Sequence, residues 1–299
     1  MVRASLLTTT AIPADPGPKP RDEELDLFGL THPGKVRRQN DDHFLVCTVH
    51  QQIAVHGTSL PDADRLPLRS QRLATILLVA DGVGGRKEGG EASRLALETI
   101  MRYVSTTMQC FHLAGRSTEQ EFHEALRAGA LEAHEAVRAE AAQRGQEKGM
   151  ATTLTLALAV WPQMYVVQVG DSRCYLFSHG KLRQVTRDQT LAQNLADRGA
   201  LPAERVAASP FSHVLASAIG GSEATPEVTR VALHGGVVGL LCSDGLTKHV
   251  SDPEIAERIR DMESSEQLCV ALLDLALERG GSDNITVIAG RARGSAKQS

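Results

Sequence analysis

Short apolar runs bounded by glycine or charged residues recur along the chain. Three of them are rich in β-branched residues, and such runs are typical of buried strands rather than helices. They cover residues 74–80, 164–169 and 237–242. The sequence therefore predicts at least three strands in the core of the protein.

Two helices are predicted in the middle of the chain. Residues 92–108 carry apolar side chains at the spacing of one helix face. A capping box, in which Thr118 is followed three residues later by Glu121, opens a second helix that we expect to end near Arg144. These helices interrupt the series of predicted strands.

Two more helices are predicted toward the end of the chain. Ser251 precedes the first, with Glu254 three residues later. Ser264 precedes the second, with Gln267 in the same position, and this helix stops at Gly280. Because helices and strands come in clusters instead of alternating, the pattern favours an α+β fold with antiparallel sheets.

Polar and proline-rich segments mark the limits of one predicted domain. Residues 1–23 contain four prolines and few apolar residues, which predicts a flexible tail. We expect a single catalytic domain over residues 24–293, without an internal repeat, and a short flexible tail at 294–299. Residues 57–71 are expected to form a surface hairpin loop.

Composition narrows the class of protein. The chain has 36 acidic and 32 basic residues and a net charge of -4, so it lacks the basic field of a nucleic-acid or membrane-surface binder. No run reaches the roughly 20 apolar residues of a membrane span. Five scattered cysteines without a C-x-x-C pair disfavour a disulfide framework and a zinc knuckle. We expect a cytoplasmic monomer that binds neither nucleic acid nor membrane.

Each of the three predicted strands is followed by an acid and a small residue. The pairs are Asp81-Gly82, Asp171-Ser172 and Asp244-Gly245. An acid at the end of a buried strand lies at the rim of the core, and the small residue after it leaves space for a ligand. Taken singly, each acid could equally be a turn or N-cap residue. Three repeats of one arrangement favour a shared pocket.

Two further acids, Asp42 and Asp283, lie in similarly polar, turn-like segments. Carboxylates that converge repel one another and do not all stay ionised near neutral pH unless cations neutralise them. A set of oxygen ligands without His or Cys suits Mg²⁺ or Mn²⁺ rather than zinc. Two such ions close together can activate a bridging water for attack on phosphorus.

Arg37 lies five residues before Asp42 and is a candidate for binding phosphate. A guanidinium matches phosphate oxygens with two parallel hydrogen bonds, which a lysine does not. The alternative is that Arg37 and Arg38 form a solvated basic turn.

These motifs occur in a characteristic order. They cover residues 34–42, 81–85, 149–153, 170–173, 186–188, 243–246 and 283–286. In this order they resemble the metal-dependent type 2C (PPM family) Ser/Thr protein phosphatases, and the resemblance to the bacterial branch runs from about Leu25 to Arg291. It implies a four-layer α-β-β-α sandwich of two antiparallel sheets flanked by helices.

The resemblance also implies a set of site residues. Ligands of two catalytic Mn²⁺ or Mg²⁺ ions would be Asp42, Asp81, the Gly82 carbonyl, Asp244 and Asp283. Asp81 would bridge the two ions, and Asp171 would hold a weaker third ion together with Asp244. Arg37 corresponds to the arginine that clamps phosphate, so Arg37, Asp81 and Asp244 would be catalytic. Residues 189–213 resemble a mobile flap that is linked to substrate choice.

One departure from the family concerns the general acid. Val83 stands where animal members have a histidine, and valine does not donate a proton. His249 is an alternative donor, although a surface histidine at a helix end is the simpler interpretation.

We therefore expect hydrolysis of phosphoserine and phosphothreonine in proteins by a hydroxide that bridges two metal ions. The resemblance implies that phosphorylated proteins are the partners and that a Hanks-type Ser/Thr kinase is opposed. A catalytically idle phosphatase-like scaffold or sensor is the alternative, and retention of all five acids argues against it. A two-metal nuclease is a third alternative. The excess of acidic over basic residues argues against it, because a nuclease binds a polyanion.

Overall fold

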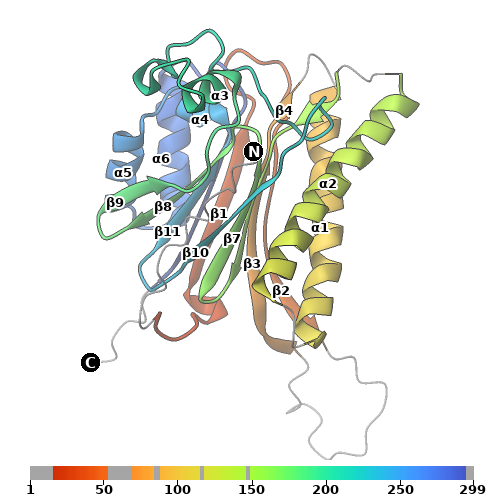
Figure 1. Cartoon of the computed structure of the whole chain (residues 1–299). Coiled ribbons are helices and arrows are strands. Elements are labelled where there is room, and N and C mark those ends of the chain that lie inside the picture. Colours follow the sequence, from red (N-terminus) through yellow and green to blue (C-terminus); the bar gives the residue numbers. More distant parts are fainter. Residues whose placement is uncertain (1–15, 53–68, 84–87, 115–117, 146–148, 294–299) are drawn as a thin grey trace, which may run out of the picture.

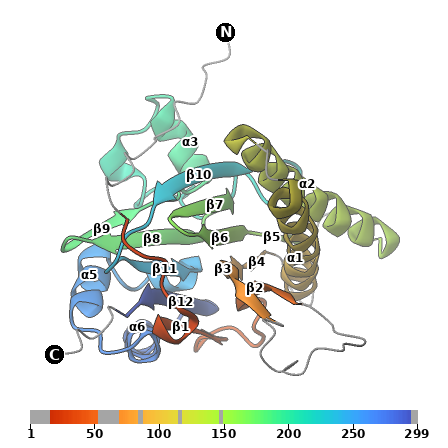
Figure 2. The ribbon, with the colours of Figure 1, turned by 90° about the horizontal axis from the view of Figure 1, so that it is seen from below.

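Two five-stranded antiparallel sheets lie face to face, with helices on both outer sides (Figure 1). The computed structural model describes residues 16–52, 69–83, 88–114, 118–145 and 149–293. The view from below shows the two sheets side by side between their helices (Figure 2). The predicted α+β class and the four-layer sandwich are confirmed.

The first sheet has the strand order β1-β12-β11-β8-β9. Its strands are β1 (Leu25–His32), β12 (Ile285–Ala292), β11 (Val238–Cys242), β8 (Arg173–Ser178) and β9 (Lys181–Gln184). Helices α5 (Asp252–Arg260) and α6 (Ser265–Glu278) cover this sheet, and the short helix α4 (Asp244–Thr247) follows β11 directly.

The second sheet has the order β10-β7-β6-β3-β2. Its strands are β10 (Glu227–Ala232), β7 (Gln163–Val169), β6 (Leu154–Val160), β3 (Arg69–Ala80) and β2 (His43–Gln52). Helices α1 (Glu88–Ala114) and α2 (Glu119–Gln143) pack on it. A two-stranded ladder of β4 (Gly82–Val83) and β5 (Ala151–Thr152) extends one end. The remaining helical turns are η1 (Asp22–Glu24), α3 (Leu191–Asp197) and η3 (Ala203–Arg205).

Strand β3 shows why the apolar runs lack alternation. Ile76 and Leu78 face α1 and α2, whereas Leu77 and Val79 face the other sheet, and all four are buried. A strand that is covered on both faces needs apolar residues at every position. A third cluster, which includes Leu240 and Leu268, fills the space under α6. The three cores correspond to the three interfaces of a four-layer structure.

The predicted strands at 74–80, 164–169 and 237–242 correspond to β3, β7 and β11. The predicted helix starts are confirmed as well. Thr118 Oγ1 accepts a hydrogen bond from Glu121 N at 3.2 Å, and Ser264 Oγ accepts one from Gln267 N at 3.1 Å. Cys47, Cys174, Cys242 and Cys269 are free; the last three are buried and Cys47 is partly buried. The side chain of Cys110 lies outside the described part.

The surface loop that we predicted at 57–71 ends earlier than expected. Strands β2 and β3 pair antiparallel, and the pairing reaches Arg69, so residues 69–71 belong to β3 and not to the loop. Residues 53–68 lie outside the described part of the chain.

Residues 16–23, which we expected in a flexible tail, contact the sandwich. Trp161 Nε1 donates a hydrogen bond to the Gly17 carbonyl at 3.3 Å, and Lys19 Nζ donates one to the carbonyl of Arg72. The buried Arg72 guanidinium binds Asp22 Oδ1 at 2.6 Å. This segment is ordered because it covers apolar surface and a buried cation; residues 1–15 lie outside the described part.

The two limits of the predicted catalytic domain lie together. Leu25 pairs with Ala292 across the first sheet, and Arg293 N donates a hydrogen bond to the Glu24 carbonyl at 2.7 Å. These contacts bring together the two ends of the segment for which we predicted a catalytic domain.

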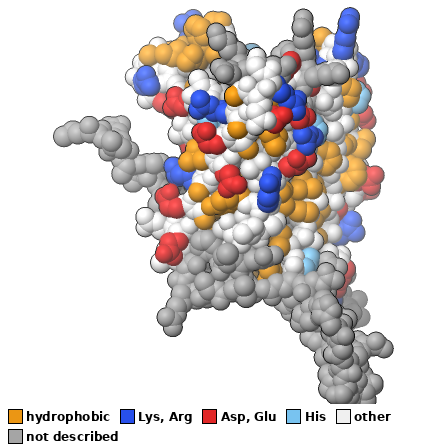
Figure 3. All heavy atoms as spheres, turned by 90° about the vertical axis from the view of Figure 1, so that its right-hand side faces the viewer, with side chains coloured by type: hydrophobic (Ala, Val, Ile, Leu, Met, Phe, Trp, Pro, Cys, Tyr) orange, Lys and Arg blue, Asp and Glu red, His pale blue; other side chains and the backbone are white. Residues whose placement is uncertain are grey.

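The outer face of α1 and α2 carries acidic and basic side chains side by side (Figure 3). Glu91 pairs with Arg94 at 2.6 Å and with Arg144 at 2.9 Å, so it joins α1 to the end of α2. This face therefore has mixed charge. Among the described helices, none has the length and apolar character needed to cross a membrane.

Candidate metal centre

Acids from several separate segments meet at one end of the sandwich. Asp81 follows β3, and Asp171 lies two residues after β7. Asp244 begins α4, and Asp283 lies two residues before β12. A hollow of about 390 Å³ is lined by Asp41, Asp81, Gly82, Asp171, Asp244 and Asp283, among others. The structure thus brings together the predicted ligands; Asp42 does not line the hollow itself but lies close enough to Asp81 for its charge to raise the pKa of Asp81.

Asp42 lies behind the wall of this hollow, and Asp41 lines it. Asp42 is 3% exposed, and its Oδ2 accepts hydrogen bonds from Ser243 Oγ at 2.8 Å and Thr286 Oγ1 at 2.7 Å. Asp41 and Asp42 therefore face different surroundings, although they are adjacent in the chain. Asp41, which we had not included among the ligands, is the member of the pair that lines the hollow.

Thr153 ties two of the acid-bearing segments together. Asp81 N donates a hydrogen bond to Thr153 Oγ1 at 2.9 Å, and Thr153 N donates one to the Asp81 carbonyl at 2.9 Å. Thr153 Oγ1 also lies 2.7 Å from Ser172 Oγ, at hydrogen-bonding distance. The segments after β3 and β7 are therefore fixed to each other by one buried side chain.

Asn284 fixes the segment that contains Arg37. Its Oδ1 accepts a hydrogen bond from Asp41 N at 2.8 Å, and its Nδ2 donates to the carbonyls of Pro33 at 3.0 Å and Gln39 at 2.8 Å. Because Asn284 directly follows Asp283, these three bonds hold the 33–41 segment against the start of β12.

Glycines permit the close approach of these segments. A Cβ atom at Gly34, whose φ is +80°, would lie 2.1 Å from the Asp283 carbonyl oxygen. A Cβ atom at Gly245 would lie 1.9 Å from the Asn284 carbonyl oxygen. Any larger residue at either position would push the acid-bearing segments apart.

The hollow is electrostatically unfavourable for its own acids. Burial, followed by the charges of Asp42 and Asp244, raises the pKa of Asp81 well above its usual range. Burial and then the charge of Asp244 raise the pKa of Asp171 to about 8. Burial also raises the pKa of Asp42 to about 6. Several of these carboxyl groups would hold protons near neutral pH unless positive charge is placed among them.

Two basic side chains already reach into the cluster. Arg37 Nε lies 2.7 Å from Asp283 Oδ1, and its guanidinium also donates to Asp283 Oδ2 at 3.0 Å. Lys248 Nζ lies 2.6 Å from Asp244 Oδ2 and 2.7 Å from Asp283 Oδ2. Burial opposes ionisation of Asp283, but the bonds from Arg37 and Lys248 outweigh it and lower its pKa. Our sequence analysis did not single out Lys248, although its position four residues after Asp244 was a signal.

The chemistry of the hollow fits a divalent metal ion. Among the described residues, the buried oxygens Asp42 Oδ1 and Asp244 Oδ1 have no hydrogen-bond partner. The surrounding groups are carboxylates and backbone carbonyls, which suit Mg²⁺ and Mn²⁺. Within the described ranges, no three Asp, Glu, His or Cys side chains form a ready-made ligand cluster. Arg37 and Lys248 bind carboxylate oxygens in this arrangement, so an ion would share those oxygens with them.

His249 is not placed as a proton donor, which agrees with the simpler interpretation of this residue given above. His249 Nε2 accepts a hydrogen bond from Ser282 N at 3.0 Å, and His249 does not line the hollow. Val83 lines it, without a group that donates a proton. His213, at the end of the predicted flap, lines the hollow as well. The structure therefore offers His213, which the sequence analysis had not proposed, in place of His249.

The predicted flap is anchored at its first residue. Gln189 N donates a hydrogen bond to the Gly170 carbonyl at 3.0 Å, and Gly170 N donates one to Gln189 Oε1 at 2.9 Å. The flap then passes through α3 and η3 and borders a second hollow of about 560 Å³, which Asp171 and Asp244 also line.

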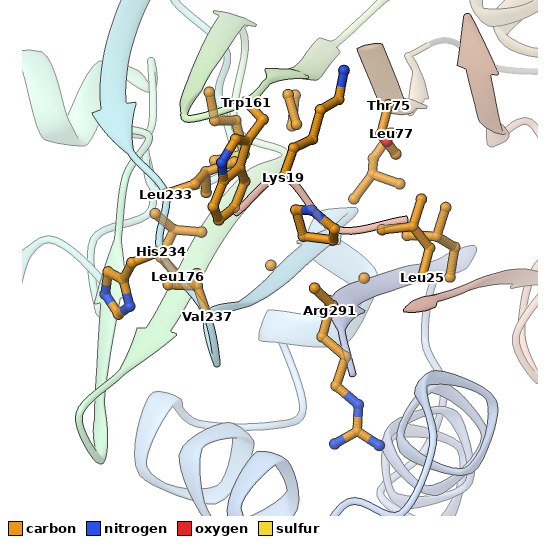
Figure 4. A pocket seen from close by; sticks show the side chains of 18 of the residues that line it. Lys19, Leu25, Thr75, Leu77, Trp161, Leu176, Leu233, His234, Val237 and Arg291 are labelled. Carbon is orange, nitrogen blue, oxygen red and sulfur yellow. The ribbon is translucent and has the colours of Figure 1, made fainter. Parts of the chain in front are cut away.

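A separate apolar hollow of about 100 Å³ lies between the sheets (Figure 4). It is lined by Leu77, Leu176 and Val237, with Lys19 and Trp161 at its edge. The Arg291 guanidinium points away from the apolar hollow and donates a hydrogen bond to Asp26 Oδ2 at 3.0 Å. The pairing of Leu25 with Ala292 and of His32 with Ile285 places this hollow and the acids at opposite ends of β1.

Comparison with known proteins gives a consistent result. Residues 56–275 match the family model described as protein phosphatase 2C. The chain is 34% identical to the serine/threonine protein phosphatase PstP of Mycobacterium tuberculosis over 72% of this chain and 40% of that protein. It is 28% identical to the serine/threonine phosphatase Stp of Listeria innocua over 86% of this chain and 92% of that protein. The chain thus spans less than half of the length of PstP.

A solved structure of the catalytic domain of PstP in complex with two manganese ions is similar to this fold. The TM-score is 0.67 at 29% sequence identity, and the match covers 89% of this chain and 97% of that chain. The similarity therefore extends over nearly the whole sandwich and not only over the motifs.

The role of Asn284 in fixing the site leads to a prediction. Replacement of Asn284 by Ala leaves three backbone groups without this partner, and we expect a loss of about 1–3 kcal/mol in the free energy of unfolding. Urea unfolding measures this loss of stability. A Mn²⁺ titration should show that Asn284→Ala binds Mn²⁺ more weakly than the unchanged protein. Asn194→Ala in α3 is the control. Equal effects of the two substitutions on stability and on Mn²⁺ binding would contradict the role.

Proposed function

This chain belongs to the protein phosphatase 2C family, and we propose that it hydrolyses phosphoserine and phosphothreonine in proteins with two Mn²⁺ or Mg²⁺ ions. The observation that carries the proposal is the convergence of carboxylates from separate segments on one hollow. The manganese ions in the PstP structure support the choice of metal.

We assign the central position among the ligands to Asp81. Its pKa is raised, after burial, by the charges of Asp42, Asp244, Asp171 and Asp283, so Asp81 lies within reach of the whole cluster. On one side of it, Asp41 and the Gly82 carbonyl would hold one ion. On the other side, Asp244 and Asp283 would hold the second. Bound ions would supply positive charge to the carboxylates and to the phosphate, and they would lower the pKa of water.

Asp42 would act from behind these ligands rather than as one of them. Two hydroxyl donors hold its Oδ2, and its Oδ1 is directed to a buried position without a hydrogen-bond partner among the described residues. An oxygen in this situation suits a water molecule of the coordination sphere. Asp171, with Asp244, borders both the main hollow and the hollow beside the flap.

Arg37 would bind the phosphate group of the substrate. Its side chain is 55% exposed at the rim of the hollow, and two of its nitrogens are held by Asp283. This contact fixes the plane of the guanidinium while leaving part of it open to a ligand. A guanidinium held in this way is prepared to donate two hydrogen bonds to phosphate oxygens.

His213 would donate the proton that the leaving oxygen of serine or threonine requires. It lines both the main hollow and the hollow beside the flap, where a substrate peptide would approach. Val83 also lines the main hollow but has no proton to donate. Because His213 lies on the flap, substrate binding and protonation of the leaving group would involve the same segment.

The natural partners would be phosphorylated proteins, and a bacterial Ser/Thr kinase of the Hanks type would supply them in the cytoplasm. The similarity to the serine/threonine phosphatases PstP and Stp supports phosphorylated proteins as substrates. An idle scaffold is the rival proposal. It is disfavoured because Asp81, Asp244 and Asp283 all line the hollow together with Arg37. A nuclease would need a basic surface around its site.

The first test concerns metal-dependent turnover. Asp81→Asn should lower Mn²⁺-dependent hydrolysis of a phosphothreonine peptide by more than about 100-fold, because a ligand charge is lost at the centre of the cluster. The rate of hydrolysis is measured from the phosphate released at fixed times. Asp197→Asn, at an exposed position, is the control. Absence of Mn²⁺-dependent turnover in the unchanged protein, or equal turnover in Asp81→Asn, would favour the idle scaffold.

The second test concerns Arg37. Arg37→Ala should raise KM for small phosphate esters by about tenfold, because a charge-assisted pair of hydrogen bonds to phosphate is lost. Mn²⁺ affinity should change little. The neighbouring Arg38→Ala is the matched control and should leave KM unchanged. An unaltered KM in Arg37→Ala would favour the solvated turn over the phosphate clamp.

The third test uses the leaving group to identify the proton donor. His213→Gln should lower kcat by about 100-fold for a phosphothreonine peptide. It should have little effect on p-nitrophenyl phosphate, whose leaving group needs no proton. His179→Gln, on an exposed turn of the first sheet, is the control. A similar loss of kcat for both substrates would mean that His213 does not act as the acid.

A further inference from the structure

The apolar hollow between the sheets is lined by small residues from both of them. Gly239 of β11 and Gly290 of β12 are paired partners in the first sheet. Ala157 and Ala159 of β6 line the hollow from the second sheet. Because sheets that pack face to face lie about 10 Å apart, the space between them is filled only where larger side chains project into it. These four residues leave part of that space open.

The packing around Gly239 would accept a side chain. A Cβ atom at Gly239 would lie 3.7 Å from the Gly290 carbonyl oxygen and 3.9 Å from Leu176 Cδ2, which are ordinary contact distances. A Cβ atom at Gly290 would lie 2.9 Å from Leu27 Cδ2, so Leu27 would have to move. The hollow therefore remains open although a single larger residue at position 239 would fill part of it.

The hollow continues from the interior toward the surface. Leu77 and Leu176 are 7% and 6% exposed, whereas Leu25 and Trp161, which also line the hollow, are partly exposed. The side chain of Lys19 extends between Trp161 and Leu77 (Figure 4). An apolar group between the sheets would thus be connected to solvent past Lys19 and Trp161.

The rim of the hollow is basic. Lys19, Arg72 and His234 line it, and none of the described residues that line it is acidic. Lys19 Nζ donates a hydrogen bond to the Arg72 carbonyl and has no carboxylate partner within the described part of the chain. Burial, followed by the charge of Arg72, lowers the pKa of Lys19, and the charge of Asp22 opposes these effects without outweighing them. A negative charge beside Lys19 would stabilise the ammonium.

We propose that this hollow binds a small amphipathic carboxylate, such as a medium-chain fatty acid, with its apolar part between the sheets and its carboxylate beside Lys19. Small apolar cavities stay dry and take up apolar molecules. A few polar groups at the edge of an apolar pocket fix the orientation of the ligand. Since the hollow and the acids lie at opposite ends of β1, the site is separate from the metal centre and the proposal does not depend on the proposed function.

Trp161 reports on this site directly, because it is the only tryptophan in the chain. Octanoate is the probe, titrated below the concentration at which it forms micelles while the emission of Trp161 is recorded. We expect a saturable change, and calorimetry should give one octanoate per chain. Octanol, the neutral molecule of the same chain length, should bind about fivefold more weakly. The absence of saturable binding at millimolar octanoate, or an affinity for octanol that equals the affinity for octanoate, would overturn the proposal.

A substitution at Gly239 tests the position of the apolar part. Gly239→Val should lower the affinity for octanoate by about tenfold, because its methyl groups would occupy the hollow. Gly235→Val is the matched control, since a Cβ atom at Gly235 would meet nothing within 4 Å and Gly235 does not line the hollow. Equal affinity in Gly239→Val and the unchanged protein would place octanoate elsewhere and overturn the proposal.

A substitution at Lys19 tests the position of the carboxylate. Lys19→Gln should lower the affinity for octanoate by about fivefold and leave the affinity for octanol unchanged. Lys181→Gln, which removes an exposed lysine from β9, should change neither affinity. An unchanged affinity for octanoate in Lys19→Gln, or an equal loss for octanoate and octanol, would overturn the proposal. Circular dichroism establishes that each variant is folded. Lys19 is itself exposed, so Lys19→Gln serves as the test even where Gly239→Val does not fold.

Discussion

Repulsion among buried carboxylates at one end of the sandwich is the constraint on which the site depends. Burial and mutual repulsion raise the pKa values of Asp81, Asp171 and Asp42, so the cluster is stable in its charged form only when cations lie among the acids. The fold supplies part of this charge through Arg37 and Lys248, which bind Asp283 and Asp244. Divalent ions would supply the rest, and the same positive charge would attract a phosphate group.

The sandwich is suited to hold such a cluster because several strands end at one rim. The acids extend from β3, β7, β11 and β12, whose other residues are buried in three hydrophobic cores. Small polar side chains then join the segments pairwise: Thr153 joins the segments after β3 and β7, and Asn284 joins the 33–41 segment to β12. Rigid cores thus fix the carboxylates at positions that repulsion alone would not favour.

Much of this organisation could be predicted from the sequence, and the failures have physical reasons. The apolar runs and capping boxes predicted β3, β7, β11 and the helix starts, because burial and capping are local signals. The choice of Asp41 over Asp42 depended on the direction of two adjacent side chains, which motifs do not show. Residues 16–23 were taken as a tail because their proline content is a local signal, whereas their contacts with Arg72 and Trp161 are made over long distances in the sequence. His213 was missed for a related reason, since only the folded chain shows that it borders the acids. The spacing of Lys248 from Asp244 was a signal in the sequence that we did not use.

The account as a whole requires metal ions in the acid-lined hollow. Anomalous diffraction from crystals grown with Mn²⁺ tests this most directly, because manganese gives peaks that protein atoms do not. The account predicts two peaks on either side of Asp81, one near Asp41 and Gly82 and the other near Asp244 and Asp283, while Lys248 stays beside Asp244. A hollow without anomalous peaks at millimolar Mn²⁺, or peaks that Asp81 does not contact, would contradict it.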